Sequence, residues 1–348
     1  MFLRVLRVLC VSVVLVMATI YLTEQGSKLS KTSKRLVIEK DGQTLLEIPE
    51  FKVERVLIFG NVQITTQAMA FLLDNGIEVS FLSLYGKYRG RLSPVESKNA
   101  QLRIHQYQKH LDNDFKVSLA KAIVHAKLHN GRELLMRYAR NHPEIDFSQY
   151  AAQMEECISR LGHKEAVNSV MGVEGAAASV YFEAFGKMLR KELGFERRQR
   201  RPPKDTVNAL LSLGYTLIGN EMHSMICAVG FDPYIGFFHG IDYGRPSLAL
   251  DLIEPFRHAI IDRFTLYLVN NHILTEKDFE DKGEEGVLLN DDARKRYFVE
   301  YEKYMTKDVE SNLSEAKKGF RDLFKIQAHN MHDVVIGAST FNPYQMKD

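Results

Sequence analysis

Short apolar stretches separated by turn residues fill the N-terminal part of the chain, from Thr19 to about Leu92. β-Branched and aromatic residues concentrate in these stretches, and this composition predicts strands. The dipeptide Asp41-Gly42 lies between two of the stretches and is a strong signal for a hairpin. The expected strands are Thr19–Thr23, Arg35–Lys40, Thr44–Pro49, Val53–Phe59 and Ile77–Ser83.

Beyond Pro94 the spacing of apolar residues changes to the 3.6-residue period of amphipathic helices. One short helix is expected earlier, at Gln67–Asp74, where Thr65 or Thr66 can cap it. Strands followed by helices indicate an α+β chain, with a small N-terminal β domain at 17–95 and a larger all-α C-terminal domain at 96–348. The expected helical segments are Ser97–Asp112, Phe115–Asn141, Phe147–Ser159, His163–Lys191, Asp205–Val229, Leu248–Asn270 and Asp291–Ala328.

Residues 1–16 differ from the rest of the chain. Arg4 and Arg7 precede the uncharged run Val8–Thr23, which resembles the charged and apolar regions of a signal peptide. The run is shorter than the about 20 apolar residues that a spanning helix needs, and its end, Thr19–Leu22, has the composition of a strand. We therefore expect 1–16 to be a misassigned start, with translation beginning at Met17. A membrane anchor or an export signal is the alternative.

Composition narrows the class of protein. The chain has 348 residues, of which 45% are hydrophobic and 26% charged, so it can bury a sizeable core. Its 3 cysteines form no CxxC pair, which excludes a disulfide scaffold and a thiolate zinc cluster and fits a reducing compartment. The net charge is only +2. Any nucleic-acid-binding surface must therefore come from local clustering of basic residues.

Two polar residues stand out because their neighbours are small or apolar. Glu174 lies in the Gly- and Ala-rich stretch 172–178, where small neighbours allow a backbone or a phosphate to approach closely. A solvated position on the outer face of a tightly packed helix is the alternative. His239 lies in the glycine-flanked stretch 236–240, where a packed or capping histidine is more usual than a metal ligand.

A third candidate site is the stretch 250–257. Asp251 and Glu254 are three residues apart, so they share one face of a helix, and Arg257 follows on the same stripe. Carboxylates beside apolar residues must be paired or bind metal if they are buried. The alternative is a surface network in which Asp251 and Glu254 pair with Arg257.

One histidine and two or three carboxylates from separate elements would make an oxygen and nitrogen site for Mg²⁺ or Mn²⁺. Such a site suits phosphodiester chemistry, since the metal ion stabilises the attacking and leaving oxygens. Spacing alone does not show that the three stretches meet.

A basic stretch at 187–204 points to the substrate. Arginine and lysine side chains in such blocks bind phosphate backbones without reading sequence, although a solubilising surface is the alternative. A second, weaker group combines Lys87, Arg89 and Arg91 with Tyr85 and Tyr88. The candidate DNA-binding residues are Arg197, Arg198, Arg200, Arg201 and Lys204.

Several stretches together resemble the universal CRISPR-associated endonuclease and integrase of the spacer-adaptation module, the Cas1 family. They are LTEQGSKLS at 22–30, VERVLIFGNVQITTQAMAFLLDNGIEVSFLS at 53–83, GVEGAAASVYF at 172–182, RPPKDTVNALLSLGYTL at 201–217 and GFFHGIDYGRPSLALDLIEPFR at 236–257. The resemblance covers the chain from Met17 to roughly Ala328.

This resemblance implies site residues and partners. Glu174, His239 and Glu254 would bind the divalent metal ion, Mg²⁺ or Mn²⁺, and Asp251 would support the site. The N-terminal β domain would form a homodimer, and the helical domain would hold the catalytic site. Two such dimers would flank a dimer of a small ferredoxin-like CRISPR-associated partner, with double-stranded DNA lying across the assembly.

We therefore expect a cytoplasmic, metal-dependent DNA endonuclease and integrase that inserts captured foreign DNA fragments into a CRISPR array during antiviral adaptation. A general nuclease for branched or repair DNA, without integration, is one alternative. A membrane-anchored nucleic-acid-binding protein, with a structural acidic cluster, is the other.

Overall fold

The computed structural model describes residues 13–16, 19–84, 86, 88–93, 99–189, 195–199 and 202–347, with residues 13–16 described by their backbone alone. The chain divides into two compact units. The first contains residues 1–95 and 289–302, and the second contains residues 96–288 and 303–348. The sequence predicts a division between residues 95 and 96, with 289–302 in the second part. In the structure, residues 289–302 belong to the first unit.

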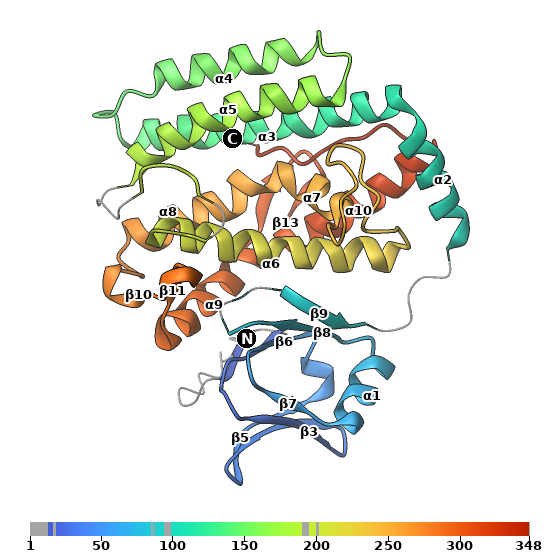
Figure 1. Ribbon diagram of the computed structural model, residues 1–348, viewed down its shortest axis with the longest axis vertical. Coiled ribbons are helices and arrows are strands. Elements are labelled where there is room, and N and C mark those ends of the chain that lie inside the picture. The colour runs from blue at the N-terminus through green and yellow to red at the C-terminus, as the bar shows by residue number, and fades with distance from the viewer. Residues whose placement is uncertain are drawn as a thin grey trace. The chain divides into compact units, whose positions relative to one another are not determined.

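The first unit contains a five-stranded mixed sheet (Figure 1). β2, β6 and β8 are parallel neighbours, whereas the two outer strands pair antiparallel. β1 lies within the stretch expected to be a misassigned start and pairs with β2 along its whole length. The strands, in spatial order, are β1 (Val13–Val16), β2 (Thr19–Leu22), β6 (Arg55–Phe59), β8 (Glu78–Leu82) and β9 (Tyr88–Leu92).

A second sheet of four strands completes the β part of this unit. The predicted hairpin is confirmed, because β4 and β5 pair antiparallel and Lys40 faces Gln43. Asp41 and Gly42 both have positive φ, 50° and 77°, as a type I′ turn requires. The strands, in spatial order, are β5 (Gln43–Pro49), β4 (Arg35–Lys40), β3 (Lys28–Thr32) and β7 (Gln63–Ile64), with a 3₁₀ turn at Glu50–Lys52.

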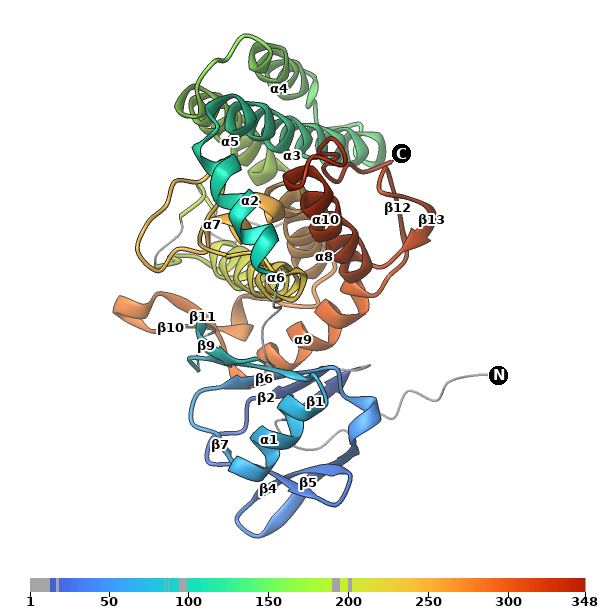
Figure 2. The same ribbon diagram turned by 90° about the vertical axis from the view of Figure 1, so that its right-hand side faces the viewer.

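Helix α1 (Thr66–Asp74) packs between the two sheets, as Figures 1 and 2 show. Thr65 accepts a hydrogen bond from the Ala68 N–H, so Thr65 is the cap of the two that the sequence allowed. Ala68 and Leu72 are fully buried together with apolar residues of both sheets. The apolar faces that predicted the strands therefore form one core.

Helix α9 (Asp291–Met305) explains why residues 289–302 belong to the first unit. The ring of Phe298 stacks on Tyr21 of β2, with 4.2 Å between the ring centroids. Tyr21 also donates a hydrogen bond to Glu302. The single helix expected at Asp291–Ala328 is wrong, because the hairpin of β12 (Val309–Ser311) and β13 (Ser314–Lys318) separates α9 from α10 (Phe320–Val335).

The second unit is mostly helical. α3, α4 and α5 pack against one another, and α7 lies between α3 and α6 (Figures 1 and 2). The expected all-α domain also contains two small hairpins, so mostly helical is the accurate description. Its remaining elements are α2 (Ala100–Leu111), α3 (Asn113–Asn141), α4 (Ser148–Leu161), α5 (Val167–Met188), α6 (Thr206–Val229), α7 (Ser247–Ile253), α8 (Arg263–Asn270), β10 (Phe279–Asp281) and β11 (Val287–Leu289), with 3₁₀ turns at Glu276–Asp278 and Gly283–Glu285.

The helix expected at Leu248–Asn270 is broken in the middle. α7 ends at Ile253, a 3₁₀ turn covers Glu254–Phe256, and a π-helical turn covers His258–Asp262 before α8 begins. Pro255 has no N–H to donate to an α-helix, which favours the change of winding here. Glu254 therefore lies at a bend, between α3 and α6.

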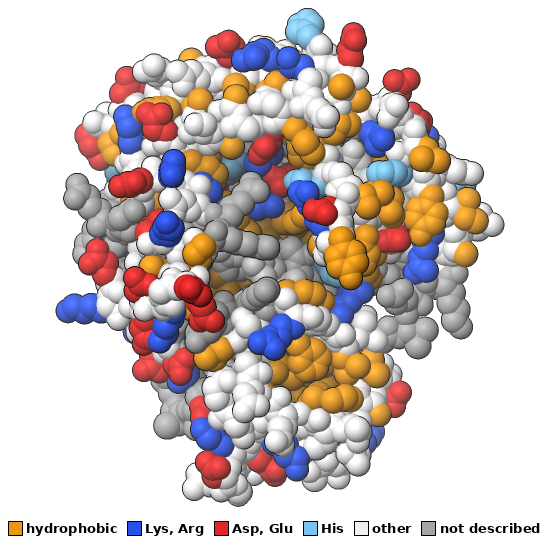
Figure 3. All heavy atoms as spheres, in the orientation of Figure 1, with side chains coloured by type: hydrophobic (Ala, Val, Ile, Leu, Met, Phe, Trp, Pro, Cys, Tyr) orange, Lys and Arg blue, Asp and Glu red, His pale blue; other side chains and the backbone are white. Residues whose placement is uncertain are grey.

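No helix in the described ranges is long and apolar enough to cross a membrane. Charged side chains of both signs are interspersed over α4 and α5, at the top of the view in Figure 3. This mixture agrees with the low net charge of +2.

Candidate metal centre

Two of the predicted metal ligands share one cation. Glu174 comes from α5, Glu254 from the bend after α7, and Lys127 from α3. The Nζ atom of Lys127 forms an ion pair with Glu174 Oε1, and it lies 2.7 Å from Glu254 Oε2. The two carboxylates are 80 residues apart in the chain, yet their oxygens are directed at one point.

Glu254 is kept ionised by its neighbours. The residue is 4% exposed, and its Oε1 atom lies 2.9 Å from Arg257 Nε. Burial alone would raise the pKa of Glu254, but Arg257, Lys127 and His239 outweigh burial and hold this pKa well below its usual range. Burial alone would lower the pKa of Lys127. The neighbouring carboxylates of Glu254 and Glu174 have the larger effect, so the pKa of this ammonium is raised.

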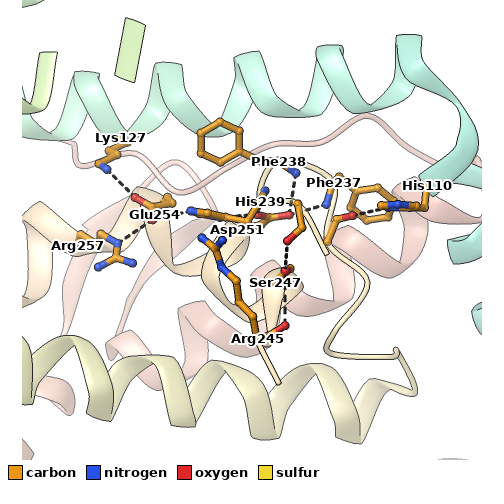
Figure 4. A network of polar contacts seen from close by, with 12 residues as sticks. His110, Lys127, Phe237, Phe238, His239, Arg245, Ser247, Asp251, Glu254 and Arg257 are labelled. Atoms are coloured by element: carbon orange, nitrogen blue, oxygen red, sulfur yellow. Dashed lines mark hydrogen bonds and ion pairs between the residues drawn. The ribbon is translucent and has the colours of Figure 1, made fainter. Parts of the chain in front are cut away.

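His239 lies in the loop between α6 and α7. One nitrogen of its ring faces Asp251 and the other faces Glu254 (Figure 4). Its Nδ1 atom is 2.8 Å from Asp251 Oδ1, and its Nε2 atom is 3.8 Å from Glu254 Oε1. The Asp251 carboxylate is placed to accept a hydrogen bond from Nδ1–H, and this contact fixes the orientation of the ring. The other ring nitrogen, Nε2, is thereby directed toward Glu254.

Asp251 organises the loop that carries His239. The residue is fully buried, and its carboxylate accepts hydrogen bonds from the backbone N–H groups of Phe237 (2.6 Å), Phe238 (3.0 Å) and His239 (2.8 Å). A surface network of Asp251 with Arg257 is therefore wrong, and in this stretch the ion pair is that of Glu254 with Arg257.

Gly236 allows this close approach. A Cβ atom built on Gly236 would lie 2.8 Å from Asp251 Oδ2 and 2.8 Å from Ser247 Cβ. The loop is also held from outside, because His110 Nδ1 lies 2.7 Å from the Gly236 carbonyl oxygen and Ser247 Oγ donates to the Gly240 carbonyl oxygen. His239 therefore sits in a fixed loop.

A buried network lies next to the carboxylates and was not anticipated from the sequence. Asp262 is fully buried and accepts hydrogen bonds from the hydroxyl groups of Tyr181 and Tyr215. His258 Nδ1 lies 2.6 Å from Asp262 Oδ2. Burial, reinforced by Asp262, raises the pKa of both tyrosines well above the usual value, so both remain protonated donors. The Tyr215 ring lies under the Arg257 guanidinium and thereby supports the partner of Glu254.

The donor set fits a hard divalent cation, although the arrangement is not a ready-made coordination shell. Across the part of the chain that the structure describes, no three His, Cys, Asp or Glu side chains are positioned to hold a metal ion. The two carboxylates and the imidazole nevertheless have the chemistry that Mg²⁺ and Mn²⁺ prefer. Lys127 already shows that Glu174 and Glu254 can bind one cation together.

Arg245 is a second residue, besides Lys127, that the sequence did not single out. It belongs to the same loop as His239, and its side chain runs toward His239 in Figure 4. Within the described residues its guanidinium forms no ion pair. Arginine guanidinium groups often recognise phosphates, because they can donate two parallel hydrogen bonds.

The predicted DNA-binding residues are placed differently from one another. Arg197 and Lys204 are exposed. Arg198 is directed inward, where it donates hydrogen bonds to Asn208 Oδ1 (2.8 Å) and Ser212 Oγ (3.2 Å). Arg198 is therefore engaged by α6, contrary to the expectation of a free phosphate contact. Arg200 and Arg201 lie outside the described residues, as do Tyr85 and Lys87 of the weaker basic group.

Comparison with known proteins identifies the family of the chain independently of the geometry of the site. A family profile described as "CRISPR associated protein Cas1" matches residues 20–303. The CRISPR-associated endonuclease Cas1 3 of Thermus thermophilus is 33% identical over 321 residues, covering 91% of this chain and 94% of the relative.

Solved structures share the fold. The Cas1 protein TM1797 from Thermotoga maritima matches with a TM-score of 0.80 and 27% identity, over 94% of this chain and 99% of that chain. A casposase bound to an integration product matches with a TM-score of 0.83 and 23% identity, over 94% and 93% of the two chains. A Cas6-RT-Cas1–Cas2 complex matches with a TM-score of 0.80 and 24% identity, over 94% of this chain and 36% of that one.

Proposed function

The chain belongs to the CRISPR-associated Cas1 family, and we propose from this that it is a metal-dependent DNA endonuclease and integrase. It would insert captured DNA fragments into a CRISPR array. The observation that supports the proposal is that Glu174 and Glu254, from separate elements, both contact the ammonium of Lys127, while Nε2 of His239 lies 3.8 Å from the other carboxylate oxygen of Glu254. The relatives' names as endonucleases and the fold shared with an integration complex support the same chemistry.

The metal would be held by a carboxylate oxygen of Glu174, a carboxylate oxygen of Glu254 and Nε2 of His239. When bound, Mg²⁺ or Mn²⁺ polarises a phosphoryl oxygen and stabilises the attacking and leaving oxygens of a displacement at phosphorus. Asp251 would hold the His239 ring so that Nε2 faces the metal ion. Arg257 keeps Glu254 anionic.

The reaction would be a transesterification. The 3′-oxygen of the captured fragment forms a bond to a phosphorus atom of the repeat strand while the bond from that phosphorus to its own 3′-oxygen breaks. Because the 3′-hydroxyl attacks the phosphorus directly and its proton is balanced by the one that the leaving 3′-oxygen gains, the displacement would need no covalent intermediate with the protein. Arg245 would bind the phosphate under attack, and Arg197 and Lys204 would bind the backbone further away.

The partners follow from the family. We propose a homodimer through the N-terminal β unit, with two such dimers flanking a dimer of a small ferredoxin-like CRISPR-associated protein. The Cas6-RT-Cas1–Cas2 complex, whose Cas1 part shares this fold, supports a partner of this kind. The substrate would be double-stranded DNA in the cytoplasm, where a CRISPR array is found.

A strand-transfer assay tests this function. Wild-type protein should join a fragment with a 3′-hydroxyl to a repeat-containing duplex in Mn²⁺ and not in EDTA. His239→Ala should reduce joining to the EDTA level, because it removes the nitrogen ligand. Near-normal Mn²⁺-dependent joining by His239→Ala would refute the proposed metal centre. Cleavage of branched DNA without any joining would instead identify a general nuclease.

A further inference from the structure

Lys127 is in an unusual environment for a lysine, because its side chain is buried against two carboxylates. The residue is 7% exposed and comes from the middle of α3. Its ammonium contacts Glu174 on α5 and Glu254 at the bend after α7, and Figure 4 shows it directed at Glu254. Lysines are almost never buried unless they are paired. The position of Lys127 is therefore tied to these two carboxylates.

The two carboxylates depend on this ammonium for charge balance. Arg257 also contacts Glu254, but on the other carboxylate oxygen. Among the ion pairs of the described residues, those of Lys127 are the ones that join Glu174 to Glu254. Two carboxylates held close together without a cation repel each other. Lys127 therefore keeps both oxygens directed at the same point when no metal ion is bound.

The surroundings of Lys127 allow its ammonium to move. A cavity of about 10 Å³ adjoins Lys127 and Glu174, with Tyr181 and His258 in its wall. This is about the space that one water molecule needs. A lysine carries a compact charge on a flexible four-carbon chain. The ammonium therefore has an adjoining space of about its own size into which side-chain rotation could move it, without unfolding α3.

We propose that Lys127 is a placeholder cation, which occupies the position between Glu174 and Glu254 until a divalent metal ion displaces it. This inference rests on the proposed function, because it requires the two carboxylates to be metal ligands. The metal-free site stays assembled, since its like charges are neutralised from within. The same ammonium lowers the affinity for metal, because it must be displaced before both carboxylates can bind the ion.

Mn²⁺ binding to the full chain, measured by isothermal titration calorimetry without DNA, tests the proposal. Lys127→Met removes the charge and keeps an unbranched side chain. Lys121→Met is the matched control, because Lys121 lies on the same helix and its Nζ donates to the Gly162 carbonyl oxygen instead. A neighbouring opposite charge changes the proton affinity of a carboxylate by about 10- to 1,000-fold. We therefore expect Lys127→Met to bind Mn²⁺ at least about tenfold more tightly than wild type, and Lys121→Met to match wild type.

Thermal unfolding gives a second readout. In EDTA, Lys127→Met should unfold at a lower temperature than wild type and Lys121→Met, and Mn²⁺ should raise its Tm by more than it raises that of wild type. If Lys127→Met folds only with metal, the loaded variant should release Mn²⁺ to excess EDTA more slowly than loaded wild type. Release as fast as from wild type, or faster, would overturn the proposal.

Glu254→Gln separates this inference from the function on which it rests. Loss of Mn²⁺ binding in Glu254→Gln establishes the metal centre whatever Lys127 does. If Lys127→Met then binds Mn²⁺ no more tightly than wild type, the metal centre stands and the placeholder role is wrong. If neither wild type nor Lys127→Met binds Mn²⁺, the proposed function and this inference both fail.

Discussion

Asp251 shows how one buried carboxylate can position a histidine. It accepts three backbone N–H groups of the loop and also holds Nδ1 of His239. From the family resemblance, Asp251 was expected to support the site rather than bind the metal. Its contacts agree with that role, and they add a second one, because the same carboxylate also organises the loop backbone.

Asp251→Asn tests both roles of this carboxylate. The amide has one acceptor oxygen in place of two, so at least one backbone N–H is left without a partner, at a cost of about 1–3 kcal/mol. Loss of a group that orients a metal ligand typically lowers metal affinity or activity by about 10- to 100-fold. We expect urea unfolding to show the first effect and the strand-transfer assay to show the second. Wild-type values in both assays would show that Asp251 orients nothing.

Gly236 and Gly240 form a matched pair in the loop of His239. A Cβ atom on Gly236 would lie 2.8 Å from Asp251 Oδ2, whereas nothing lies within 4 Å of a Cβ atom on Gly240. Gly236→Ala should therefore destabilise the protein by about 1–3 kcal/mol, as overpacking does, and Gly240→Ala should not. Denaturant unfolding of the two variants measures the difference. If Gly236→Ala and Gly240→Ala were equally stable, the loop backbone would be able to shift away from Asp251 without a cost in free energy.

At the scale of elements, the basic stretch divides into exposed and engaged residues. Arg197 and Lys204 are exposed, whereas Arg198 is hydrogen-bonded to α6 and lies over the Tyr215 ring. Replacing Arg197 and Lys204 by Ala should lower the log–log salt slope of duplex binding by up to about 1.8, at about 0.9 for each phosphate contact. Arg198→Ala should leave the slope unchanged and lower Tm. If Arg198→Ala alone lowered the salt slope of duplex binding, Arg198 would be a phosphate contact and the division into exposed and engaged residues would be wrong.

Most elements could be predicted from the sequence where one face is apolar, and the exceptions have physical causes. β3 was missed because only Leu29 of its five residues is buried, so the strand shows no alternation. The β12–β13 hairpin was missed because most of its residues are exposed or half-buried and give no strand pattern. At the bend, the winding changes from α-helical to 3₁₀ at Glu254–Phe256 and to π-helical at His258–Asp262, and the 3.6-residue period of apolar residues does not reveal these changes.

The candidate ligands of the site could be named from the sequence, but the buried cation beside them could not. Glu174, His239 and Glu254 could be named from motifs that resemble a family. Lys127 could not, because it lies in an amphipathic helix where a lysine usually marks the solvent-facing side. Only the packing of α3 against α5 and the bend after α7 makes this residue a buried cation. Contacts between distant segments carry that information.

At the scale of the whole molecule, we propose a different role for each of the two units. The first unit holds the sheets through which we propose a homodimer, and the second holds the candidate metal ligands Glu174, His239 and Glu254. All three predicted ligands lie within the residues 20–303 that match the family. The whole account therefore depends on whether one metal ion binds Glu174, Glu254 and His239 together.

Anomalous scattering from a crystal of the wild-type protein soaked in Mn²⁺ tests this claim most directly. The account predicts one strong peak bonded to oxygens of Glu174 and Glu254 and to Nε2 of His239, at about 2.0–2.2 Å, with the Lys127 ammonium moved away from both carboxylates. No peak at this point in a crystal whose protein catalyses Mn²⁺-dependent strand transfer would contradict it, as would a peak bound by other residues.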